Sequence, residues 1–506
     1  MASLILDAIT RHAGQQPEAT ALQESGLALS YDELATEIVR MQKRLAPETT
    51  RVLGLSVENS PAWAVIDLAA IAAGVPVVPL PGFFSAEQTI HAIRNAGINR
   101  LITDQPIVME SMLETHGMAV SARQSYQLAG RWLTQFTLAE TGAYQLPATT
   151  AKVTYTSGTT GQPKGVCLSL AAIEQVAQSL LQVTEAGTSD RHLSILPLST
   201  LLENIAGLYV PLMAGARCIL LPSQRVGLSG ATGLEPHKLL ETIQHSAATT
   251  LVLTPELLKA LVMLAEAGCE LPDSLRFVAV GGATVSHALL DRAAAVGLPV
   301  FEGYGLSECS SVVAVNSPRA HLTGSVGKPL PHVVLKFAED GEILVSGSTM
   351  LGYTGAAIAE YGNQFWPSGD TGYLDEAGYL YINGRKKNIF ITSFGRNVSP
   401  EWVESQLAQS PVIAQAALFG EARPWNTAVI VPAAHASREQ IDAVINTVNA
   451  GLPDYARVRR WIYADAPFTG KNQQMTPNFR LRRDLIWQAY ANRINHLYEE
   501  SADVCL

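Results

Sequence analysis

The stretch YTSGTTGQPKG, Tyr155 to Gly165, gathers glycines, hydroxyl residues and a lysine into one short run. Glycines let backbone N–H groups approach an anion, hydroxyls add hydrogen bonds, and a lysine adds positive charge, so a polyphosphate fits such a loop. The pattern is not a Walker loop, because Gly165 rather than Ser or Thr follows Lys164. A polar surface turn is the ordinary alternative for this run taken alone.

The totals describe a folded protein of more than one domain. The chain has 506 residues, 47% of them hydrophobic and 16% charged, and chains of this length usually divide into two or more domains. The formal net charge of -10 argues against a nucleic-acid partner, because phosphate backbones call for a concentrated basic face. A soluble acidic protein is therefore expected.

The cysteines and the first residues predict a cytoplasmic protein. No CxxC pair or metal-ligand spacing joins the cysteines, so we expect reduced thiols. Asp7 and Arg11 interrupt the N-terminal stretch before a signal-peptide core could form. The five cysteines are Cys167, Cys218, Cys269, Cys309 and Cys505.

The most apolar segment is AWAVIDLAAIAAGVPVVPLPGFF, which begins at Ala62. A membrane helix needs about 20 apolar residues without interruption, whereas this segment contains Asp67 and three prolines. It therefore predicts a buried helix followed by a strand, and no membrane-spanning segment.

Strand-like and helix-like runs alternate through the first 330 residues, which predicts an α/β fold. Ser30 and Glu33 form a capping-box pattern before an amphipathic helix. After Leu330 the runs shorten, and hairpins are expected across residues 339–341 and 375–378, giving a β-rich subdomain. Beyond Arg385 a compact α+β unit follows.

Four further stretches accompany the opening loop: GYGLSE (303–308), SGDTGYLDEAGYLYINGRKKN (368–388), FGRNVSPEWVE (394–404) and TPNFRLRR (476–483). Each alone has an ordinary reading, such as an Asx turn or a solvated glutamate. In this order and spacing the five motifs resemble the adenylate-forming superfamily of acyl-CoA synthetases, luciferases and peptide-synthetase adenylation domains. The resemblance covers nearly the whole chain and implies an N-terminal domain (1–384), a hinge (385–388) and a mobile C-terminal lid (389–506).

The resemblance implies a two-step reaction that uses ATP and Mg²⁺. A carboxylate attacks the α-phosphate of ATP to give an acyl adenylate and pyrophosphate, and a thiol then displaces AMP. The thiol would be that of coenzyme A or of the phosphopantetheine arm of a carrier protein. The first step brings a carboxylate against a polyanion, so positioning and charge neutralisation are the main tasks of the site.

Most of the implied site residues follow from the motifs one by one. Tyr304 would stack on adenine, Ser307 would bond the α-phosphate, and Glu308 would bind Mg²⁺, which prefers oxygen ligands. The segment Gly281, Gly282, Ala283 would pass between adenine and the acyl pocket. The loop residues that would hold the β- and γ-phosphates are Thr156, Ser157, Gly158, Thr159, Thr160 and Gly161, with Lys164 nearby.

The later motifs supply the ribose site and the hinge. Asp370 would accept hydrogen bonds from both ribose hydroxyls through its two oxygens. Arg385 would support ribose or phosphate, and Lys387 occupies the pivot position of the hinge. A solvated basic turn is the alternative reading of the GRKKN run.

The match fails at one catalytic position. Relatives carry a lysine that bridges the substrate carboxylate and the α-phosphate, and TPNFRLRR places Arg480 there. Arginine keeps the charge, but its planar fork is bulkier than an ammonium group. Lys471 is the competing candidate, at the cost of a two-residue deletion. Arg480 is favoured because the downstream LRRDLIWQAY then aligns without a gap.

Three functional hypotheses follow. The first is ATP-dependent activation of a medium- or long-chain fatty acid and its transfer to coenzyme A. The second is transfer to a carrier protein, and the third is a nucleotide-binding relative in which Arg480 impairs adenylation. The retained Glu308, Asp370 and Arg385 speak against the third. Leu201, Leu202, Ile205 and Leu208 could line an acyl pocket or simply pack as a helix.

Overall fold

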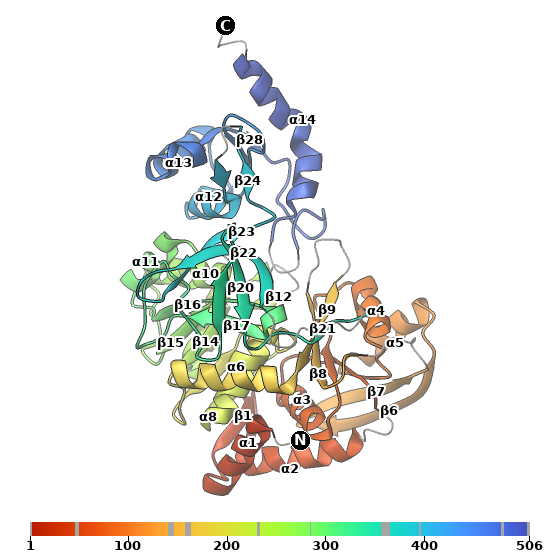
Figure 1. Cartoon of the computed structure of the whole chain (residues 1–506). Helices are drawn as coiled ribbons and strands as arrows, with labels where there is room; N and C mark the ends of the chain where they lie inside the picture. The colour runs from red at the N-terminus through yellow and green to blue at the C-terminus, as the bar shows by residue number, and fades with distance from the viewer. Residues whose placement is uncertain are drawn as a thin grey trace.

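The protein forms a large body with a small domain stacked on it, and the two chain termini lie at opposite ends (Figure 1). The predicted α/β class, with a separate C-terminal domain, is confirmed. The computed structural model describes residues 3–45, 50–139, 146–156, 163–229, 233–283, 285–355, 365–393, 396–476 and 480–502.

The first large sheet, sheet A, carries the edge on which the candidate site is built. Its strands β10, β14, β15 and β16 run parallel, so their carboxyl ends meet at one edge. The strand order is β18 (Lys328–Pro329), β17 (Ser311–Val315), β16 (Val300–Leu306), β15 (Phe277–Val280), β14 (Thr250–Leu253), β10 (Arg191–Ser194), β11 (Arg217–Leu220), β1 (Thr20–Glu24) and β2 (Leu27–Ser30).

Apolar helices cover both faces of sheet A. One face packs against α9 (Pro236–Ser246), α10 (Pro255–Glu266) and α11 (His287–Ala295), where alternate strand residues form a buried cluster. The other face packs against α6 (Leu170–Val183) and the π-helix η1 (Asn204–Tyr209). The short helices α7 (Leu201–Glu203) and α8 (Val210–Ala214) flank η1, and the two-residue strands β12 (Leu228–Ser229) and β13 (Gly233–Leu234) pair nearby.

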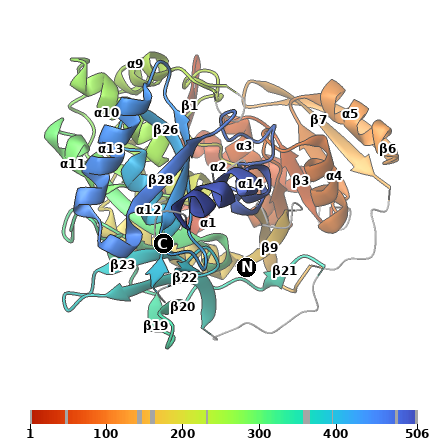
Figure 2. The same ribbon diagram turned by 90° about the horizontal axis from the view of Figure 1, so that it is seen from above.

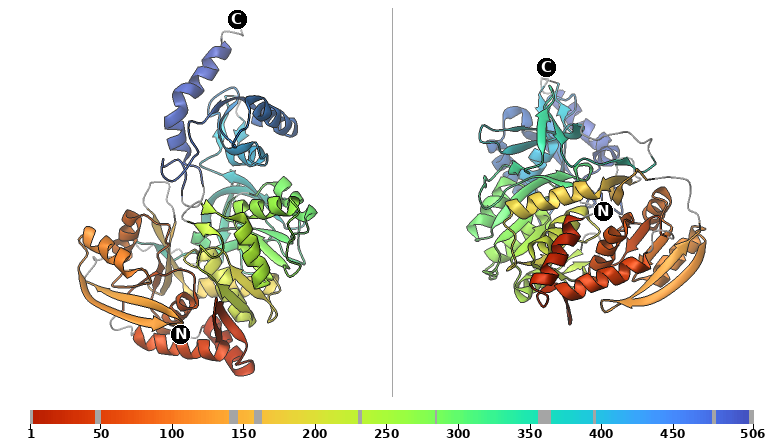
Figure 3. Two further views of the ribbon diagram at one scale, coloured as in Figure 1. Left: turned by 180° about the vertical axis from the view of Figure 1, so that it is seen from behind. Right: turned by 60° about the horizontal axis from the view of Figure 1, so that its bottom comes forward.

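The second large sheet, sheet B, forms the other half of the body. Helix α6 lies between the two halves, as the right panel of Figure 3 shows. Helices α4 (Ala86–Asn95) and α5 (Pro106–Thr115) belong to this half. The strand order is β21 (Gly352–Tyr353), β9 (Lys164–Ser169), β8 (Thr150–Thr156), β4 (Val77–Pro79), β3 (Leu53–Ser56), β5 (Arg100–Thr103), β7 (Arg131–Leu138) and β6 (Val120–Leu128).

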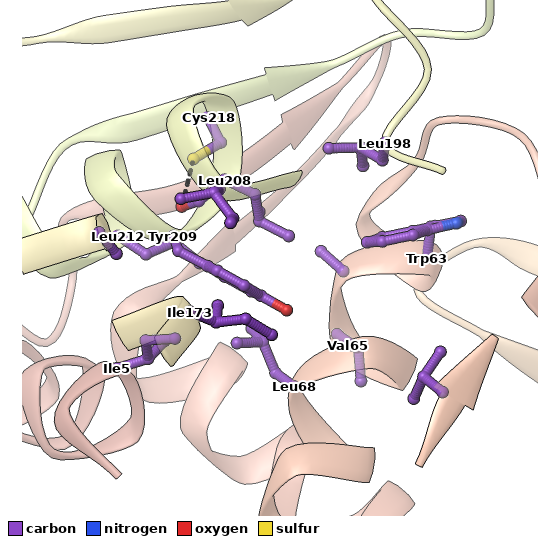
Figure 4. Packing of buried hydrophobic residues seen from close by; sticks show 14 of the residues in the cluster. Ile5, Trp63, Val65, Leu68, Ile173, Leu198, Leu208, Tyr209, Leu212 and Cys218 are labelled. Carbon is purple, nitrogen blue, oxygen red and sulfur yellow. Dashed lines mark hydrogen bonds between the residues drawn. The ribbon is translucent and has the colours of Figure 1, made fainter. Parts of the chain in front are cut away.

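The main core joins both halves. Helix α3 (Pro61–Ala73) is apolar all round and is buried from Pro61 to Ala70, as expected of a central helix. Figure 4 shows Tyr209 packed among Leu68, Ile173 and Leu208. The Tyr209 hydroxyl and the ammonium of Lys152 both bond Asp67, which explains how an acidic residue is tolerated there.

Several local predictions are confirmed. Helix α2 (Tyr31–Arg44) begins at the capping box of Ser30 and Glu33, with both reciprocal bonds present. The apolar segment after Ala62 forms a helix followed by β4. The remaining N-terminal helix is α1 (Leu4–Gln15). In the described part of the chain, no helix combines the length and apolarity that crossing a bilayer requires.

The β-rich subdomain and the C-terminal domain complete the chain. Both predicted hairpins are confirmed in the sheet β19 (Val334–Phe337), β20 (Glu342–Ser346), β22 (Trp366–Leu374) and β23 (Leu380–Arg385). Seen from above, the C-terminal domain lies over the junction of the two halves (Figure 2). Its elements are β24 (Phe390–Ile391), β25 (Asn397–Val398), α12 (Pro400–Leu407), β26 (Ile413–Phe419), β27 (Asn426–Pro432), α13 (Arg438–Gly451), η3 (Asp454–Ala456), β28 (Val458–Tyr463) and α14 (Arg483–Ala502).

Candidate active site

A single cavity of about 2860 Å³ opens at the carboxyl edge of sheet A and extends under the C-terminal domain. Residues from all five motifs line it, although the motifs span more than 300 positions of the chain. The residues named from the sequence that line it are Thr156, Lys164, Gly282, Ala283, Tyr304, Ser307, Glu308, Asp370, Arg385, Lys387 and Arg480.

Asp370 lies at the centre of a small polar network on β22. The Tyr304 hydroxyl donates to Asp370 Oδ2 at 2.6 Å, and Arg385 Nε lies 2.8 Å from Oδ1. Antiparallel pairing of β22 with β23 sets Asp370 directly opposite Arg385. Burial raises the pKa of Asp370, and the neighbouring Arg385 and Tyr304 oppose that rise. The carboxylate is therefore held in a fixed orientation on the cavity wall.

Burial, with the adjacent Asp370 carboxylate adding to it, also raises the pKa of Tyr304. The phenol is therefore neutral and acts as a donor across the physiological range. Its ring lines the cavity beside the backbone of Gly303. The pair presents an aromatic face and a carboxylate on one wall.

The two ends of the phosphate-type loop are fixed by strand pairing. Thr156 ends β8 and Lys164 begins β9, and the two residues pair in antiparallel register. Both line the cavity. Ser157, Gly158, Thr159, Thr160 and Gly161 lie outside the described residues, so their predicted contacts with phosphate stay a prediction.

Glu308 lies in the short 3₁₀ turn η2 (Ser307–Cys309), which follows β16 directly. The Tyr353 hydroxyl donates to Glu308 Oε1 at 3.0 Å, and the Lys164 ammonium lies 5.6 Å from the centre of the Tyr353 ring. No group of three or more His, Cys, Asp or Glu side chains surrounds a metal position in the described residues. One carboxylate facing a phosphate site fits Mg²⁺, which commonly binds one or two carboxylates together with substrate phosphates.

The C-terminal domain brings Arg480, and not Lys471, to the cavity. Arg480 Nη2 donates to the carbonyl oxygen of Gly282 at 3.2 Å. Its backbone is fixed by two hydrogen bonds with Thr476. Lys471 is exposed, lies in the turn before this segment, and is not among the residues that line the cavity.

The environment of Arg480 is strongly charged. Burial and the nearby Arg385 lower the pKa of Arg480, while Asp370 and Glu308 oppose the shift. The side chain nevertheless remains exposed at the mouth of the cavity, and a guanidinium stays charged in proteins. The Arg480 cation is thus close enough to the Asp370 and Glu308 carboxylates for both to act on its pKa. Lys387 lines the same cavity, and its pKa is lowered by burial and by Arg385.

A second arm of the cavity runs along the strands on the α6 side of sheet A. Leu180, Ala206, Val252, Phe277 and Ala279 line its length. Arg276 precedes β15 and Gly281 follows it, and five residues of extended strand span roughly 17 Å. Residues at both ends of β15 therefore line the cavity, about this far apart.

The far end of this arm is polar, but its polar groups are paired with one another. His192 contacts Thr250 at 2.9 Å through Nδ1 and Glu203 at 3.0 Å through Nε2. Arg276 holds Asp190 through both carboxylate oxygens. One acceptor is the exception: Glu203 Oε2 is buried and has no hydrogen-bond partner among the described residues.

The four apolar residues named from the sequence divide between the two expected roles, lining a pocket and packing in the core. Leu201 and Leu202 line the cavity, whereas Ile205 and Leu208 are fully buried in the main core. Ile205 and Leu208 lie in η1, which is a π-helix. Neither interpretation of the sequence predicted a π-helix. Such wide turns occur mostly at functional sites.

One buried acid was missed by sequence reasoning. Glu302 precedes Gly303 and Tyr304 on β16 and lines the cavity, and burial raises its pKa to about 8. The signal was its position in the strand FEGYG, where an acidic residue lies among inward-facing apolar neighbours. Glu302 is therefore expected to be a neutral carboxylic acid at neutral pH.

Comparison with known protein families agrees with this geometry. The model described as "AMP-binding enzyme" matches residues 9–354, and the one described as "AMP-binding enzyme C-terminal domain" matches residues 387–502. The protein is therefore an enzyme of the adenylate-forming superfamily, in the class of AMP-forming acid–thiol ligases. It belongs to the AMP-binding enzyme family.

Individual relatives have low sequence identity to this chain but align with most of its length. The long-chain-fatty-acid–CoA ligase FadD15 of Mycobacterium bovis is 26% identical and aligns with 87% of this chain and 86% of its own. The 2-succinylbenzoate–CoA ligase of Bacillus subtilis is 28% identical over 89% of this chain and 90% of its own.

The fold matches solved structures of the same superfamily. The anthranilate CoA ligase AuaEII in complex with anthranoyl-AMP superposes with a TM-score of 0.80 at 19% identity, covering 96% of both chains. The Bacillus subtilis O-succinylbenzoate coenzyme A synthetase in complex with ATP and magnesium gives a TM-score of 0.72 at 24% identity, over 94% of this chain and 98% of that one. These likenesses establish the fold.

Proposed function

We propose that this protein converts a medium- or long-chain aliphatic acid into its acyl adenylate with ATP and Mg²⁺, and then transfers the acyl group to the thiol of coenzyme A. The observation that carries the proposal is the position of Arg480. The C-terminal domain delivers this cation to Gly282, in the cavity that also holds Tyr304 and Asp370.

The body of the enzyme binds ATP in this scheme. Tyr304 stacks on adenine, and Asp370 accepts the two ribose hydroxyls. Thr156, Lys164 and the loop between them hold the β- and γ-phosphates. Glu308 would hold Mg²⁺, which would neutralise phosphate charge when bound.

Arg480 acts at the reacting atoms. The substrate carboxylate and the α-phosphate both carry negative charge, so a cation between them lowers their repulsion as the new P–O bond forms and pyrophosphate leaves. Arginine provides two parallel N–H groups on one face, which suits simultaneous contact with a carboxylate and a phosphate oxygen. In the second step the thiol attacks the acyl carbonyl carbon and AMP leaves with the bonding electron pair.

The inner arm of the cavity supports an aliphatic substrate. Its walls are mainly apolar, and the His192 and Arg276 side chains at its end are paired with Thr250 and Asp190. A zigzag carbon chain with bonds near 1.5 Å advances roughly 1.3 Å per carbon, so an arm of roughly 17 Å holds about 12 to 13 carbons. Small Ala206 and Ala279 leave the passage open.

Two alternatives remain within the class. In one, the acceptor is a carrier-protein phosphopantetheine, which delivers the same thiol without the nucleotide part of coenzyme A. In the other, Arg480 supports adenylation poorly and the protein mainly binds nucleotide. Both retain the ATP site described above.

An acid panel tests the proposal. Straight-chain acids from 6 to 18 carbons and several aryl acids are incubated with ATP, Mg²⁺ and the protein, and pyrophosphate release is measured before and after addition of coenzyme A or pantetheine. We expect release to peak near 12 carbons, at roughly the capacity of the arm. No release with any acid, while ATP still binds, would refute the proposal.

A variant of Ala279 tests the position of the acyl chain. Ala279→Phe places a ring in the arm, so activity with a 12-carbon acid should fall at least about tenfold, while a 6-carbon acid should be affected little. Ala294→Phe, on the exposed face of α11, is the matched control. Equal losses with both acids would show that the chain lies elsewhere.

A further inference from the structure

Glu342 is a partly buried carboxylate at the start of β20 whose two oxygens contact different parts of the site. Oε1 accepts the backbone N–H of Gly369 at 3.0 Å, and Oε2 receives the Lys386 ammonium at 2.8 Å. Gly369 immediately precedes Asp370, and Lys386 immediately precedes Lys387. One side chain therefore connects the part of β22 that carries Asp370 with the segment that carries the hinge.

The backbone reinforces this connection. Lys386 N–H donates to the carbonyl oxygen of Gly369 at 2.8 Å. Gly369 has φ of 72°, in the left-handed region, so the loop adopts a conformation that favours glycine. The N–H of Gly369 thus points at Glu342, while its carbonyl points at Lys386.

Asp340 provides a second contact to the same lysine. Its Oδ2 lies 2.6 Å from Lys386 Nζ, and its Oδ1 accepts the backbone N–H of Glu342 at 3.1 Å. Its side chain is half exposed, whereas that of Glu342 is only 12% exposed. Glu342 is the one of these two carboxylates that contacts both Lys386 and Gly369.

We infer that Glu342 is a positioning residue that ties Asp370 to the hinge, so that ATP bound at Asp370 immobilises Lys386 and restricts rotation to Lys387 and beyond. Glu342 itself does not touch substrate. The inference rests on the proposed role of Asp370 as the ribose acceptor. It moves the effective start of the hinge from 385, as the sequence predicts, to 387.

The link has a direct mechanical consequence. Arg385 and Lys386 remain with the body when the C-terminal domain rotates, since Arg385 is paired with Asp370 and Lys386 with Glu342. Withdrawal of Arg480 for the second step then turns on the bonds after Lys386. Without Glu342, the pivot would spread into residues 385–386 and the position of Arg480 would vary more.

Four substitutions separate the two contacts. Glu342→Gln keeps an oxygen for Gly369 but presents an amide to the lysine, and Lys386→Met removes the lysine charge at similar length. Glu342→Ala removes both contacts. Asp340→Asn is the matched control: it removes the carboxylate from Lys386 but keeps an amide oxygen for the Glu342 N–H, which Asp340 Oδ1 accepts at 3.1 Å.

The measurement is amide hydrogen exchange over residues 383–391 with and without ATP, in the absence of any acid, alongside ATP affinity and melting temperature. In the wild type, ATP should slow exchange of this segment at least about fivefold. Glu342→Gln and Lys386→Met should lose that slowing, while ATP affinity changes less than about threefold. Glu342→Ala should also weaken ATP binding about tenfold, because the Gly369 N–H loses its charged acceptor.

The inference is overturned if Glu342→Gln keeps the ATP-dependent slowing, or if Asp340→Asn loses it to the same extent. An unchanged exchange rate of the wild type on adding ATP overturns it as well. Because no acid is present, these outcomes are independent of pyrophosphate release. A protein that activates no acid can still pass this test, and an active one can still fail it.

Discussion

The two sides of the cavity are built differently. On the body side, Asp370, Tyr304 and Arg385 are bonded to one another and to a sheet. On the lid side, Arg480 extends from a loop and meets the body at one carbonyl oxygen, that of Gly282. The proposed nucleotide wall is fixed before substrate arrives, whereas the proposed catalytic cation is held by a contact that is easily broken.

This difference matches the needs of a two-step reaction. Binding groups work best when they are already oriented, because no reorganisation is then required. A cation needed only in the first step has to leave before a thiol can approach. In the proposed mechanism, the rigid binding groups therefore belong to the body, and the cation that has to leave belongs to the C-terminal domain.

Removal of Arg480 should produce the largest effect. Arg480→Ala is expected to slow acyl-adenylate formation by about 10²-fold or more, the scale seen when one charge-stabilising donor is lost. Attack of the thiol on preformed acyl adenylate should be nearly unchanged. Single-turnover measurement of each half-reaction separates the two.

Lys471→Ala is the matched control for that experiment, since Lys471 carries the same charge on the exposed turn nearby. It should adenylate at the wild-type rate. Arg480→Lys shows whether the planar fork itself is needed or any cation suffices. If Lys471→Ala abolishes adenylation and Arg480→Ala does not, Lys471 is the catalytic cation and the sequence alignment has to be shifted.

The next effect is expected on the free energy of unfolding, and it comes from Glu302, the buried acid of the body. Glu302 has an ordinary pKa near 4.5 and a folded value of about 8. Between these values the unfolded state releases the proton while the folded state keeps it, so stability falls as pH rises through this window and levels off above it. Glu302→Gln cannot ionise, and from pH 5 to pH 8 it should gain roughly 2–4 kcal/mol relative to wild type.

Denaturant unfolding at several pH values measures this effect. Glu339→Gln, an exposed acid in the hairpin turn, is the control and should follow the wild-type profile. A wild type and a Glu302→Gln protein with parallel stability profiles between pH 5 and pH 8 would show that Glu302 ionises normally.

Sequence patterns predicted what depends on neighbouring residues. The capping box of Ser30 and Glu33 and both hairpins follow from local turn and cap chemistry, and the structure confirms them. The membership of the superfamily also followed, because its motifs are short contiguous runs. Their residues come to line one cavity because the loops after parallel strands share an edge.

What the sequence did not predict depends on contacts between distant segments. The link from Glu342 to Gly369 and Lys386 joins positions 27 and 44 residues apart. The raised pKa of Glu302 is a consequence of burial, and the strand pattern around it does not give the extent of that burial. The π-helix η1 arises where Lys152 and Asp67 hold Asn204 and Tyr209 in the core.

Substitution of Asp370 tests directly whether the body side of the cavity binds the nucleotide. Asp370→Ala removes the proposed ribose acceptor, and one hydrogen bond to a charged group contributes roughly 1.5–3 kcal/mol, so ATP affinity should fall about tenfold or more. Tyr304→Phe keeps the ring and loses only the hydroxyl, so it should cost less. Unchanged affinity of Asp370→Ala in calorimetric titration would remove this residue from the nucleotide site.

The smallest effect is expected at a second contact between the domains. Lys259 on α10 donates to the carbonyl oxygen of Ala408, at the end of α12, at 3.0 Å. Like the contact of Arg480 with Gly282, it joins a side chain to a backbone oxygen, and a net contribution of roughly 1 kcal/mol is usual for one such bond. Lys259→Met keeps the aliphatic stem and removes the donor, so the arrangement that holds Arg480 in the cavity should become less populated.

The consequence should be opposite for the two half-reactions. Adenylation by Lys259→Met should slow about two- to fivefold, because it needs Arg480 in place, whereas thiol transfer should be unchanged or slightly faster, because it needs Arg480 withdrawn. Lys238→Met, on the neighbouring α9 and paired only with Glu235, controls for loss of a surface charge. Equal slowing of both half-reactions would mean that Lys259 supports the fold of α10 rather than the position of the lid. A selective loss of adenylation would show that the Lys259 contact helps to hold the C-terminal domain in the arrangement that places Arg480 in the cavity.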